Sequence, residues 1–266
     1  MSQTFELDKT RLRQSFGAAS ASYDSVAALQ RTAGAILLRH LTAFELTGSV
    51  LDLGCGTGFV AKHLLEIDSL GRVVALDIAL PMLQAARHKL AASSKLAFVA
   101  ADAERLPFGN ISFDAIVSNF ALQWCRDLEA LFADFRRVLK PGGKLVFSTF
   151  GPQTLSELKR AWAVVDDYRH VNEFYPPQEI IRCLQVAGFH DVVEHSEIFR
   201  PTYPTVLDLM KELKTMGAHN VAIGRNKKMT TKKQLERMIH AYPLVGRGDR
   251  IVATFQVLIF SARTTS

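Results

Sequence analysis

Three alternating glycines that follow a hydrophobic run are the part of this sequence most suited to binding a ligand. Residues 50–58 read Val-Leu-Asp-Leu-Gly-Cys-Gly-Thr-Gly. Glycines let the backbone adopt positive φ and let a ligand approach the main chain without meeting a Cβ. The free N–H groups at the start of the helical segment that follows suit an anionic group. The pattern therefore predicts a ligand-binding turn between a strand and a helix, formed by Asp52, Gly54, Gly56 and Gly58.

A second acidic residue lies at the distance that a nucleoside site requires. Asp77 closes another apolar run, Val73 to Leu76, nineteen residues after Gly58. An acid at the end of a neighbouring parallel strand can accept hydrogen bonds from two ribose hydroxyls. We therefore expect a nucleoside ligand; the alternative is a tight strand-to-helix turn that binds nothing.

Regular alternation of strand-like and helical segments indicates the elements that position these residues. After the first unit, strands are expected at 73–77, 96–99, 113–119 and 144–150, with helices at 80–92 and 127–139. Such alternation predicts an α/β fold, a doubly wound and mostly parallel sheet with helices on both faces. Ligands bind such sheets at the carboxyl ends of the strands. Four polar side chains fall at those ends, namely Asp52, Asp77, Asp102 and Asn119.

Beyond residue 150 the pattern loosens. Helices are expected at 154–168 and 177–187, and strands at 191–199 and 251–262. Between these two strands, the helical periodicity of 201–250 predicts a cap inserted before the last strand. We thus expect one domain, 1–266. Its parts are an N-terminal helical segment over the ligand site (1–45), a core (46–200 and 251–266) and the cap (201–250).

Composition excludes several classes of protein. Of the 266 residues, 48% are hydrophobic and 22% charged, which is ordinary for a soluble protein, and no apolar run approaches the length of a membrane span. The N-terminus resembles neither a signal nor a transit peptide, so a cytoplasmic protein is expected. The distant Cys55, Cys125 and Cys183 suggest neither disulfides nor a zinc site, and no histidine spacing suggests a metal. We expect a metal-free mechanism.

Positive charge is concentrated in the last quarter of the chain. Residues 201–266 carry 11 basic and four acidic side chains, whereas the net charge of the whole chain is +6. A solvated helix face would explain this excess, and so would a docking surface for an acidic partner. The densest part of the stretch contains Lys227, Lys228, Lys232 and Lys233.

Several short motifs within residues 50–150 resemble those of the Rossmann-like S-adenosylmethionine-dependent methyltransferases. Besides the glycine segment they are Leu-Asp-Ile at 76–78, Ala-Asp-Ala at 101–103, Leu-Pro-Phe at 106–108 and Lys-Pro-Gly-Gly at 140–143. A nicotinamide dehydrogenase would space its glycines differently. The resemblance implies a seven-stranded sheet and S-adenosylmethionine as methyl donor. It implies that the glycines border the methionine, that Asp77 holds the ribose and that Asn119 lies near the sulfonium. The remaining implied cofactor residues are Asp52, Ile78, Met82, Asp102, Ala103 and Gln30.

Longer segments, spread over nearly the whole chain, are similar to the biotin-pathway malonyl-acyl-carrier-protein O-methyltransferases. They include 16–24, 119–124, 148–158, 170–174 and 213–220. The resemblance implies methylation of the free carboxylate of a malonyl thioester on acyl carrier protein. It also gives the basic stretch an acidic partner, and implies a substrate role for His219 and Asn220. No nucleic acid or membrane partner is expected.

The chemistry of such a reaction is compatible with the absence of an evident catalytic base. A carboxylic acid is already ionised at neutral pH, so positioning in a dry pocket would suffice. Arg200, at the end of strand 191–199, is our candidate partner for the malonyl carboxylate, with a surface arginine as the alternative. Tyr23 could cover the sulfonium through a cation–π contact, or serve only as a core tyrosine. Phe174 is a candidate for lining the same pocket.

Two other functions remain open at this point. One is a different small-molecule O- or C-methyltransferase, although a phenol or carbon acid would need a base near the methyl group. The other is a cofactor-binding assembly factor without activity, because such relatives also carry a Met-Gly-x-x-Asn segment like that at 216–220. Nucleic-acid methylation is disfavoured, since no matching catalytic motif or recognition module is present.

Overall fold

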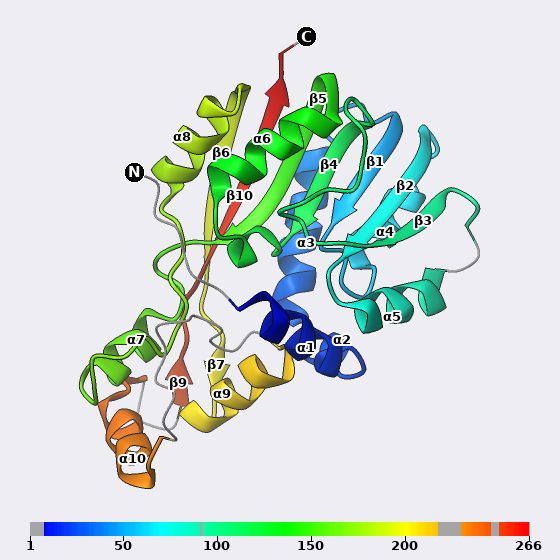
Figure 1. Ribbon diagram of the computed structural model, residues 1–266. Helices are drawn as coiled ribbons and strands as arrows, with labels where there is room; N and C mark the ends of the chain where they lie inside the picture. Colours follow the sequence, from blue (N-terminus) through cyan, green and yellow to red (C-terminus); the bar gives the residue numbers. More distant parts are fainter. Residues whose placement is uncertain (1–7, 91–92, 218–229, 246–249, 266) are drawn as a thin grey trace.

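The computed structural model describes residues 8–90, 93–217, 230–245 and 250–265. A sheet with helices on both faces forms the larger part, and a smaller cap lies below one edge of it (Figure 1). No helix in the described ranges has the length and apolar character needed to cross a membrane.

Seven strands form the main sheet, in the order β3-β2-β1-β4-β5-β10-β6. All neighbours are parallel except that β10 runs antiparallel to both β5 and β6. The mostly parallel seven-stranded sheet that the motifs imply is thus confirmed. The strands are β1 (Gly48–Leu53), β2 (Leu70–Asp77), β3 (Leu96–Ala100), β4 (Phe113–Asn119), β5 (Leu139–Phe150), β6 (Phe189–Phe199) and β10 (Phe255–Thr264).

Helices cover both faces of this sheet because each presents an apolar stripe to it. The clearest case is α6 (Leu128–Val138), whose buried residues recur at helical spacing and whose first turn is capped by Asp127. It shares one face with α8 (Pro177–Val186), and their side chains join one hydrophobic cluster. The other face is covered by α3 (Ala28–Leu41), α4 (Phe59–Leu65) and α5 (Leu80–Leu90).

The N-terminal segment lies across the carboxyl ends of the strands. It comprises α1 (Lys9–Ala19), which packs against α5, and the single turn α2 (Tyr23–Val26), which contacts the cap helix α9 (Val206–Thr215). Figure 1 shows both helices below the sheet, between the core and the cap.

The cap is built differently from the all-helical insertion that periodicity predicts. Besides α9 and α10 (Lys232–Ala241), it contains a three-stranded sheet in the order β7-β9-β8. These strands are very short: β7 (Thr202–Tyr203), β8 (Leu244–Val245) and β9 (Arg250–Val252). A helical pattern cannot reveal pairs this short, because period-2 alternation needs about four residues to be recognised.

The cap also recruits a helix from outside the insertion. Helix α7 (Ser156–Ala163) packs against α10, and Trp162 of α7 shares a buried cluster with Leu209 of α9 and Met238 of α10. The expected strand 251–262 is divided, because β9 belongs to the cap sheet and β10 to the main sheet. The cap therefore draws on residues that the sequence-based boundaries assign to the core.

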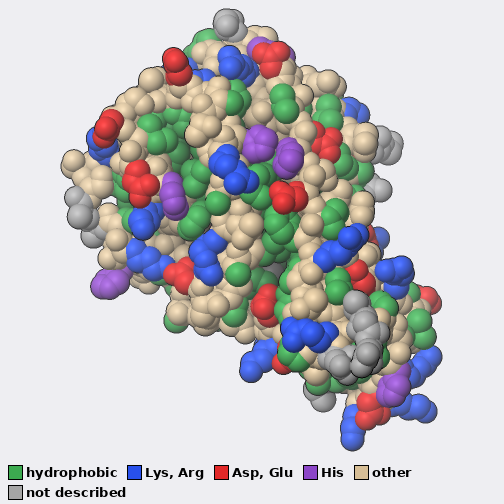
Figure 2. All heavy atoms as spheres, turned by 180° about the vertical axis from the view of Figure 1, so that it is seen from behind, with side chains coloured by type: hydrophobic (Ala, Val, Ile, Leu, Met, Phe, Trp, Pro, Cys, Tyr) green, Lys and Arg blue, Asp and Glu red, His purple; other side chains and the backbone are tan. Residues whose placement is uncertain are grey.

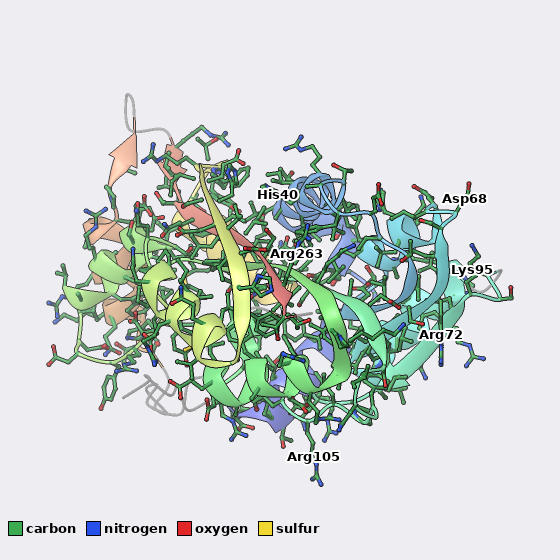
Figure 3. The ribbon with its side chains drawn as sticks, turned by 90° about the horizontal axis from the view of Figure 1, so that it is seen from above. His40, Asp68, Arg72, Lys95, Arg105 and Arg263 are labelled. Atoms are coloured by element: carbon green, nitrogen blue, oxygen red, sulfur yellow. The ribbon has the colours of Figure 1, made fainter. Side chains whose placement is uncertain are left out.

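Charge on the described part of the cap is carried by exposed side chains of α10. Lys232 and Lys233 begin this helix and Arg237 lies one turn later, with Glu236 among them. Figure 2 shows Lys and Arg side chains projecting from the cap at the lower right of the molecule. Another basic pair, Arg72 and Lys95, lies at the β3 edge of the main sheet, away from the cap (Figure 3).

Candidate active site

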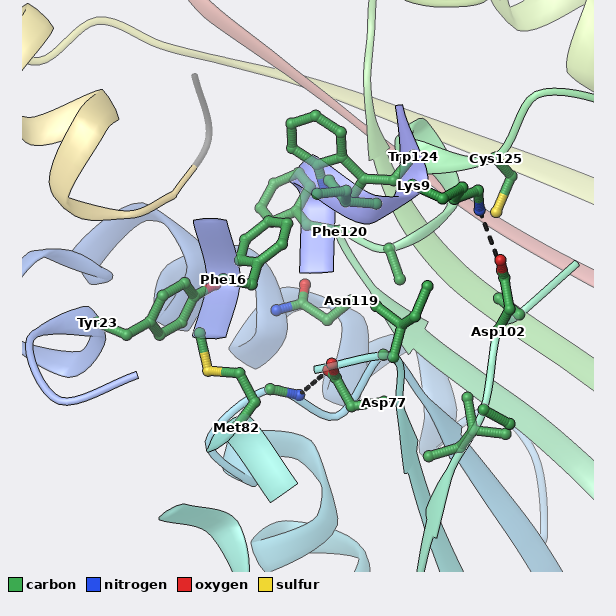
Figure 4. Close-up of a pocket in the computed structure, with 18 residues that line it drawn as sticks. Lys9, Phe16, Tyr23, Asp77, Met82, Asp102, Asn119, Phe120, Trp124 and Cys125 are labelled. Carbon is green, nitrogen blue, oxygen red and sulfur yellow. Dashed lines mark hydrogen bonds and ion pairs between the residues drawn. The ribbon is translucent and has the colours of Figure 1, made fainter. Parts of the chain in front are cut away.

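Three cavities share lining residues; the first and third lie where the strands β1, β2 and β4 end, and the second lies between the core and the cap. The first, of about 630 Å³, is enclosed by the carboxyl ends of these strands and by α1 and α2 (Figure 4). It brings together the catalytic candidate Tyr23 and most of the predicted cofactor residues, namely Gly54, Gly56, Asp77, Ile78, Met82, Asp102, Ala103 and Asn119.

A third cavity continues from the first along the glycine turn. It shares Tyr23, Gly54, Gly56 and Asn119 with the first cavity, and its empty volume is about 1190 Å³. Its lining adds the three predicted cofactor residues that the first cavity lacks, which are Gln30, Asp52 and Gly58.

The glycine turn has the backbone geometry that its sequence requires. Gly54, Gly56 and Gly58 have φ of +72°, +52° and +91°. A Cβ on Gly54 would lie 2.3 Å from the Cβ of Ala121, whereas a Cβ on Gly56 would meet nothing within 4 Å. Close packing thus excludes a side chain at Gly54, and at Gly56 the left-handed backbone alone favours glycine.

Asp77 is held by the backbone of its own turn and of the glycine turn. Its Oδ2 accepts the N–H of Gly56 at 2.9 Å and its Oδ1 accepts that of Ala79 at 2.8 Å. Burial raises the pKa of Asp77 above its usual range, although these two N–H groups favour the ionised form. The carboxylate is therefore fixed beside the first cavity.

Asp52 is a buried carboxyl group beside the third cavity. It is 1% exposed, and neither of its carboxylate oxygens has a hydrogen-bond partner among the described residues. Burial raises its pKa to about 7; the nearby N–H of Ala61 opposes this rise, and the charge of Asp77 adds to it. A buried polar group without a partner is rare and calls for an explanation. Because Asp52 lines the third cavity, a cationic ligand group there would satisfy it.

Lys9 is a site residue that the sequence did not reveal. Its ammonium lies 3.0 Å from Asp102 Oδ1 and 3.1 Å from Glu104 Oε2, and it lines the first cavity (Figure 4). This pairing ties α1 to the end of β3 and closes the cavity at that side. A single lysine in a short helix carries no sequence signal for such a long-range contact.

Asp24 fastens the segment that carries Tyr23 to the glycine turn. Its Oδ1 accepts the hydroxyl of Thr57 at 2.6 Å, and its Oδ2 pairs with Lys89 of α5. Partial burial opposes ionisation, but the bonds from Lys89 and Thr57 prevail and hold the pKa of Asp24 below its usual range. Tyr23 is thereby placed where the first and third cavities meet.

Asn119 has its amide orientation fixed by two partners. Its Nδ2 donates to the backbone oxygen of Gln30 at 3.0 Å, and its Oδ1 accepts the hydroxyl of Ser148 at 2.7 Å. The Gln30 side chain donates to the sulfur of Met216 at 3.0 Å, while its buried Oε1 has no partner among the described residues. Strand β4, helix α3 and the cap thus meet at this point.

The second cavity lies between the core and the cap and has a volume of about 820 Å³. It shares Trp124 with the first cavity and Gln30 with the third. Phe174 lines it and contacts Phe150 edge-on with ring centroids 5.5 Å apart, whereas Tyr23, for which the same pocket was expected, lines the first and third cavities. His170 also lines it, stacked on Trp162 at 3.8 Å. His170 belongs to the segment 170–174 that carries the resemblance, but it lies in a loop, and its contact with Trp162 of α7 leaves no signal in the sequence.

Arg200, the expected partner of the substrate carboxylate, is not brought to the site. It follows the last residue of β6, is exposed, and lines none of these three cavities. Strand β6 ends at the outer edge of the sheet, so proximity to the cap along the chain does not bring Arg200 to the cavities. His219, Asn220, Lys227 and Lys228 lie outside the described residues.

Comparison with known proteins gives the family. Residues 51–147 match the family described as a methyltransferase domain. The malonyl-acyl-carrier-protein O-methyltransferase of Methylococcus capsulatus is 42% identical over 92% of this chain and 90% of its own. The biotin biosynthesis bifunctional protein BioHC of Cellvibrio japonicus is 42% identical over 94% of this chain and 49% of its own.

Solved structures show the same fold at low sequence identity. The phosphoethanolamine N-methyltransferase 2 of Haemonchus contortus, solved in complex with S-adenosyl-L-methionine, superposes with a TM-score of 0.57 at 17% identity. The match covers 93% of this chain and 57% of that structure. On the strength of its closely similar full-length relatives, this chain belongs to the malonyl-acyl-carrier-protein O-methyltransferase family.

Proposed function

We propose that this enzyme transfers the methyl group of S-adenosylmethionine to the free carboxylate of a malonyl thioester on acyl carrier protein, giving the methyl ester that begins biotin synthesis. The observation that carries this proposal is the arrangement of the cavities. One cavity bears the predicted nucleoside-binding residues, another is largely apolar, and the two meet at Trp124. A donor and an acceptor bound in these cavities would face each other there.

The residues of the first and third cavities are compatible with S-adenosylmethionine. The unpartnered carboxylate of Asp52 is suited to the ammonium of the methionine part, since a buried charge requires an opposite charge. Asp77, held by two backbone N–H groups, retains lone pairs for the ribose hydroxyls. Ile78, Met82 and the Asp102–Ala103 pair line the same cavity and would surround the adenine.

The reaction needs positioning rather than proton transfer. When bound, S-adenosylmethionine supplies a methyl group on a positively charged sulfur. A malonyl carboxylate is ionised at neutral pH and forms the new O–C bond with its own electron pair. The S–C bond breaks with its electrons left on sulfur, so no proton is gained or lost. Neither a general base nor a metal ion is required.

The chain's contribution is to orient the partners and to exclude water. The fixed amide of Asn119 lines the first and third cavities, and the side chain of Gln30 lines the second and third cavities. The ring of Tyr23 lies beside them and would stabilise the positive sulfur. Phe120 of the first cavity stacks on Phe150 of the second with ring centroids 4.2 Å apart, which gives an apolar wall between the two. A dry junction strengthens each electrostatic contact within it.

We assign docking of the acyl carrier protein to the basic side chains of the cap. Exposed Lys232 and Lys233 lie on α10, and the chain segment before this helix adds Lys227 and Lys228. Acyl carrier proteins are acidic, and complementary charge accelerates encounter and fixes orientation. The cap also lines the second cavity through α9, so a docked carrier would be close to that cavity.

Formation of S-adenosylhomocysteine with a panel of acyl carriers tests the proposal. We expect turnover with malonyl-acyl carrier protein and none with the acetyl form, which lacks a free carboxylate. Equal turnover of both would contradict carboxyl methylation. Tight cofactor binding without turnover of either would favour the inactive assembly factor.

A further inference from the structure

The second cavity has an apolar wall with few polar groups. Aromatic and aliphatic side chains form most of its lining, among them Trp124, Phe150, Trp162, Phe174 and Met210. The Thr154 hydroxyl, also in the lining, donates to the backbone oxygen of Gln256 and accepts its N–H. His170 binds Asp166 at 2.7 Å. These two polar side chains are therefore already engaged within the protein.

Besides Gln30, which also lines the third cavity and whose Nε2 donates to the sulfur of Met216, Asn172 is the lining residue whose buried side-chain oxygen lacks a partner among the described residues. It lines the same cavity, and its side-chain Oδ1 is fully buried with no hydrogen-bond partner among the described residues. A buried amide oxygen without a partner is disfavoured, because it has lost its hydrogen bonds to water. An amide oxygen accepts N–H and O–H donors. A ligand that places an N–H or O–H donor in this apolar cavity would therefore satisfy the oxygen of Asn172.

We propose that Asn172 accepts a hydrogen bond from an amide N–H of the pantetheine arm that carries the malonyl group. This inference rests on the proposed function. The arm joins aliphatic segments through two secondary amides, so it matches a largely apolar wall that contains an amide oxygen able to accept a hydrogen bond. Most of its length would contact the aromatic and aliphatic lining, and the hydrogen bond to Asn172 would fix the position of the arm along the cavity.

The position of the cavity gives the arm a direction. At one end, Trp124 is shared with the first cavity, so the thioester and its malonyl group lie toward Trp124. Lys214, in the last turn of α9, is exposed and belongs to the same lining. Its ammonium is suited to the phosphate at the other end of the arm. The arm thus passes between the core and the cap.

Thioesters with and without the arm separate recognition at Asn172 from a general defect. The substrates are malonyl-acyl carrier protein, malonyl-coenzyme A, malonyl-pantetheine and the malonyl thioester of ethanethiol, which has no amide. For N172A and the similarly sized apolar N172L, we expect kcat/KM to fall about three- to tenfold with the three arm-bearing substrates. With the ethanethiol thioester it should equal the wild-type value.

Controls keep this outcome interpretable. R72A, at the distant β3 edge of the sheet, should leave kcat/KM unchanged with all four substrates, whereas M210A shortens an apolar side chain of the same cavity and should lower kcat/KM only with the three that carry the arm. Calorimetry with S-adenosylhomocysteine reports whether each variant retains a folded cofactor site. Coenzyme A and the carrier share the arm, so N172A should lower kcat/KM by the same factor with both malonyl thioesters. Charge reversal of Lys232 and Lys233 on α10 should lower kcat/KM with the carrier substrate alone.

Two results would overturn the assignment. A loss of kcat/KM in N172A that is the same with the ethanethiol thioester would show a structural role for Asn172. An unchanged kcat/KM with every substrate would show that the arm does not bind there. Failure of the proposed function itself is distinct, because wild-type enzyme would then methylate none of the four thioesters.

Discussion

Replacing Asp52 by Asn should stabilise the cofactor-free protein and at the same time weaken its binding of S-adenosylmethionine. Asp52 is 1% exposed and its carboxylate has no hydrogen-bond partner among the described residues. Ionisation at this position therefore opposes folding unless a cation is bound beside it. Asn has nearly the same shape and no charge, so it removes that opposition together with the attraction for the ammonium.

The magnitude follows from the pKa of Asp52. Burial raises it from 3.8 to about 7, so the folded protein retains a proton that the unfolded chain loses between these values. As pH rises through this window, wild-type stability falls. A difference of about three pH units corresponds to about 4 kcal/mol at pH 8, which is an upper bound for the gain in D52N. Loss of a charge-assisted hydrogen bond should weaken cofactor binding about 10- to 100-fold.

Chemical denaturation at pH 5 and pH 8, with calorimetry of S-adenosylhomocysteine binding, tests both effects. D52N should be more stable than wild type at pH 8, and the difference should shrink at pH 5, where the wild-type side chain is mostly protonated. Wild-type affinity should decrease as pH falls below about 7. A D52N protein that is less stable at pH 8, or that binds S-adenosylhomocysteine as tightly as wild type, would refute the role given to Asp52.

The remaining predictions concern the donor cover, the carrier surface and metal independence. Y23F keeps the ring and should retain most of kcat, whereas Y23A should lower kcat about tenfold by removing the cation–π contact; equal activity of the three proteins would contradict that contact. Reversing the charges of Lys232 and Lys233 should raise KM for malonyl-acyl carrier protein and make this KM less dependent on salt, while KM for malonyl-coenzyme A stays the same. Reversing the charges of Arg72 and Lys95, at the distant sheet edge, should leave both KM values unchanged. Chelation by EDTA should leave the methylation rate unchanged, and a loss restored by added metal would contradict the metal-independent mechanism.

The sheet and its ligand-binding edge could be predicted because local patterns determine them. Glycines that need positive φ and acids at the ends of apolar runs are visible in the sequence itself. Parallel β1, β2 and β4 then bring Asp52, Asp77 and Asn119 to one edge, which follows from topology alone. Their roles toward the cofactor remain a proposal.

Contacts between distant segments could not be predicted in the same way. Lys9 pairs with Asp102 across 93 positions, and His170 stacks on Trp162 only because a loop returns to α7. Arg200 shows the opposite failure. Its place beside the cap in sequence suggested a site residue, but the register of an edge strand leaves it exposed outside the cavities.

The cap was mispredicted in detail for a similar reason. The two-residue pairs of β7 and β8 with β9 have no periodicity of their own. Their formation depends on the chain reversal that brings 250–252 back beside 202–203, and on packing of α7 against α10. Such elements become stable through tertiary contacts and leave little trace in local sequence.

Mass spectrometry of malonyl-acyl carrier protein incubated with this enzyme and S-adenosylmethionine tests the central claim most directly. We expect the carrier to gain the mass of one methyl group, and fragmentation of the released acyl-pantetheine to place that methyl on the terminal carboxylate. Loss of the gain when acetyl-acyl carrier protein replaces the malonyl form would agree with this result. An unmodified malonyl carrier, or a methyl group located on the protein or on carbon, would contradict it.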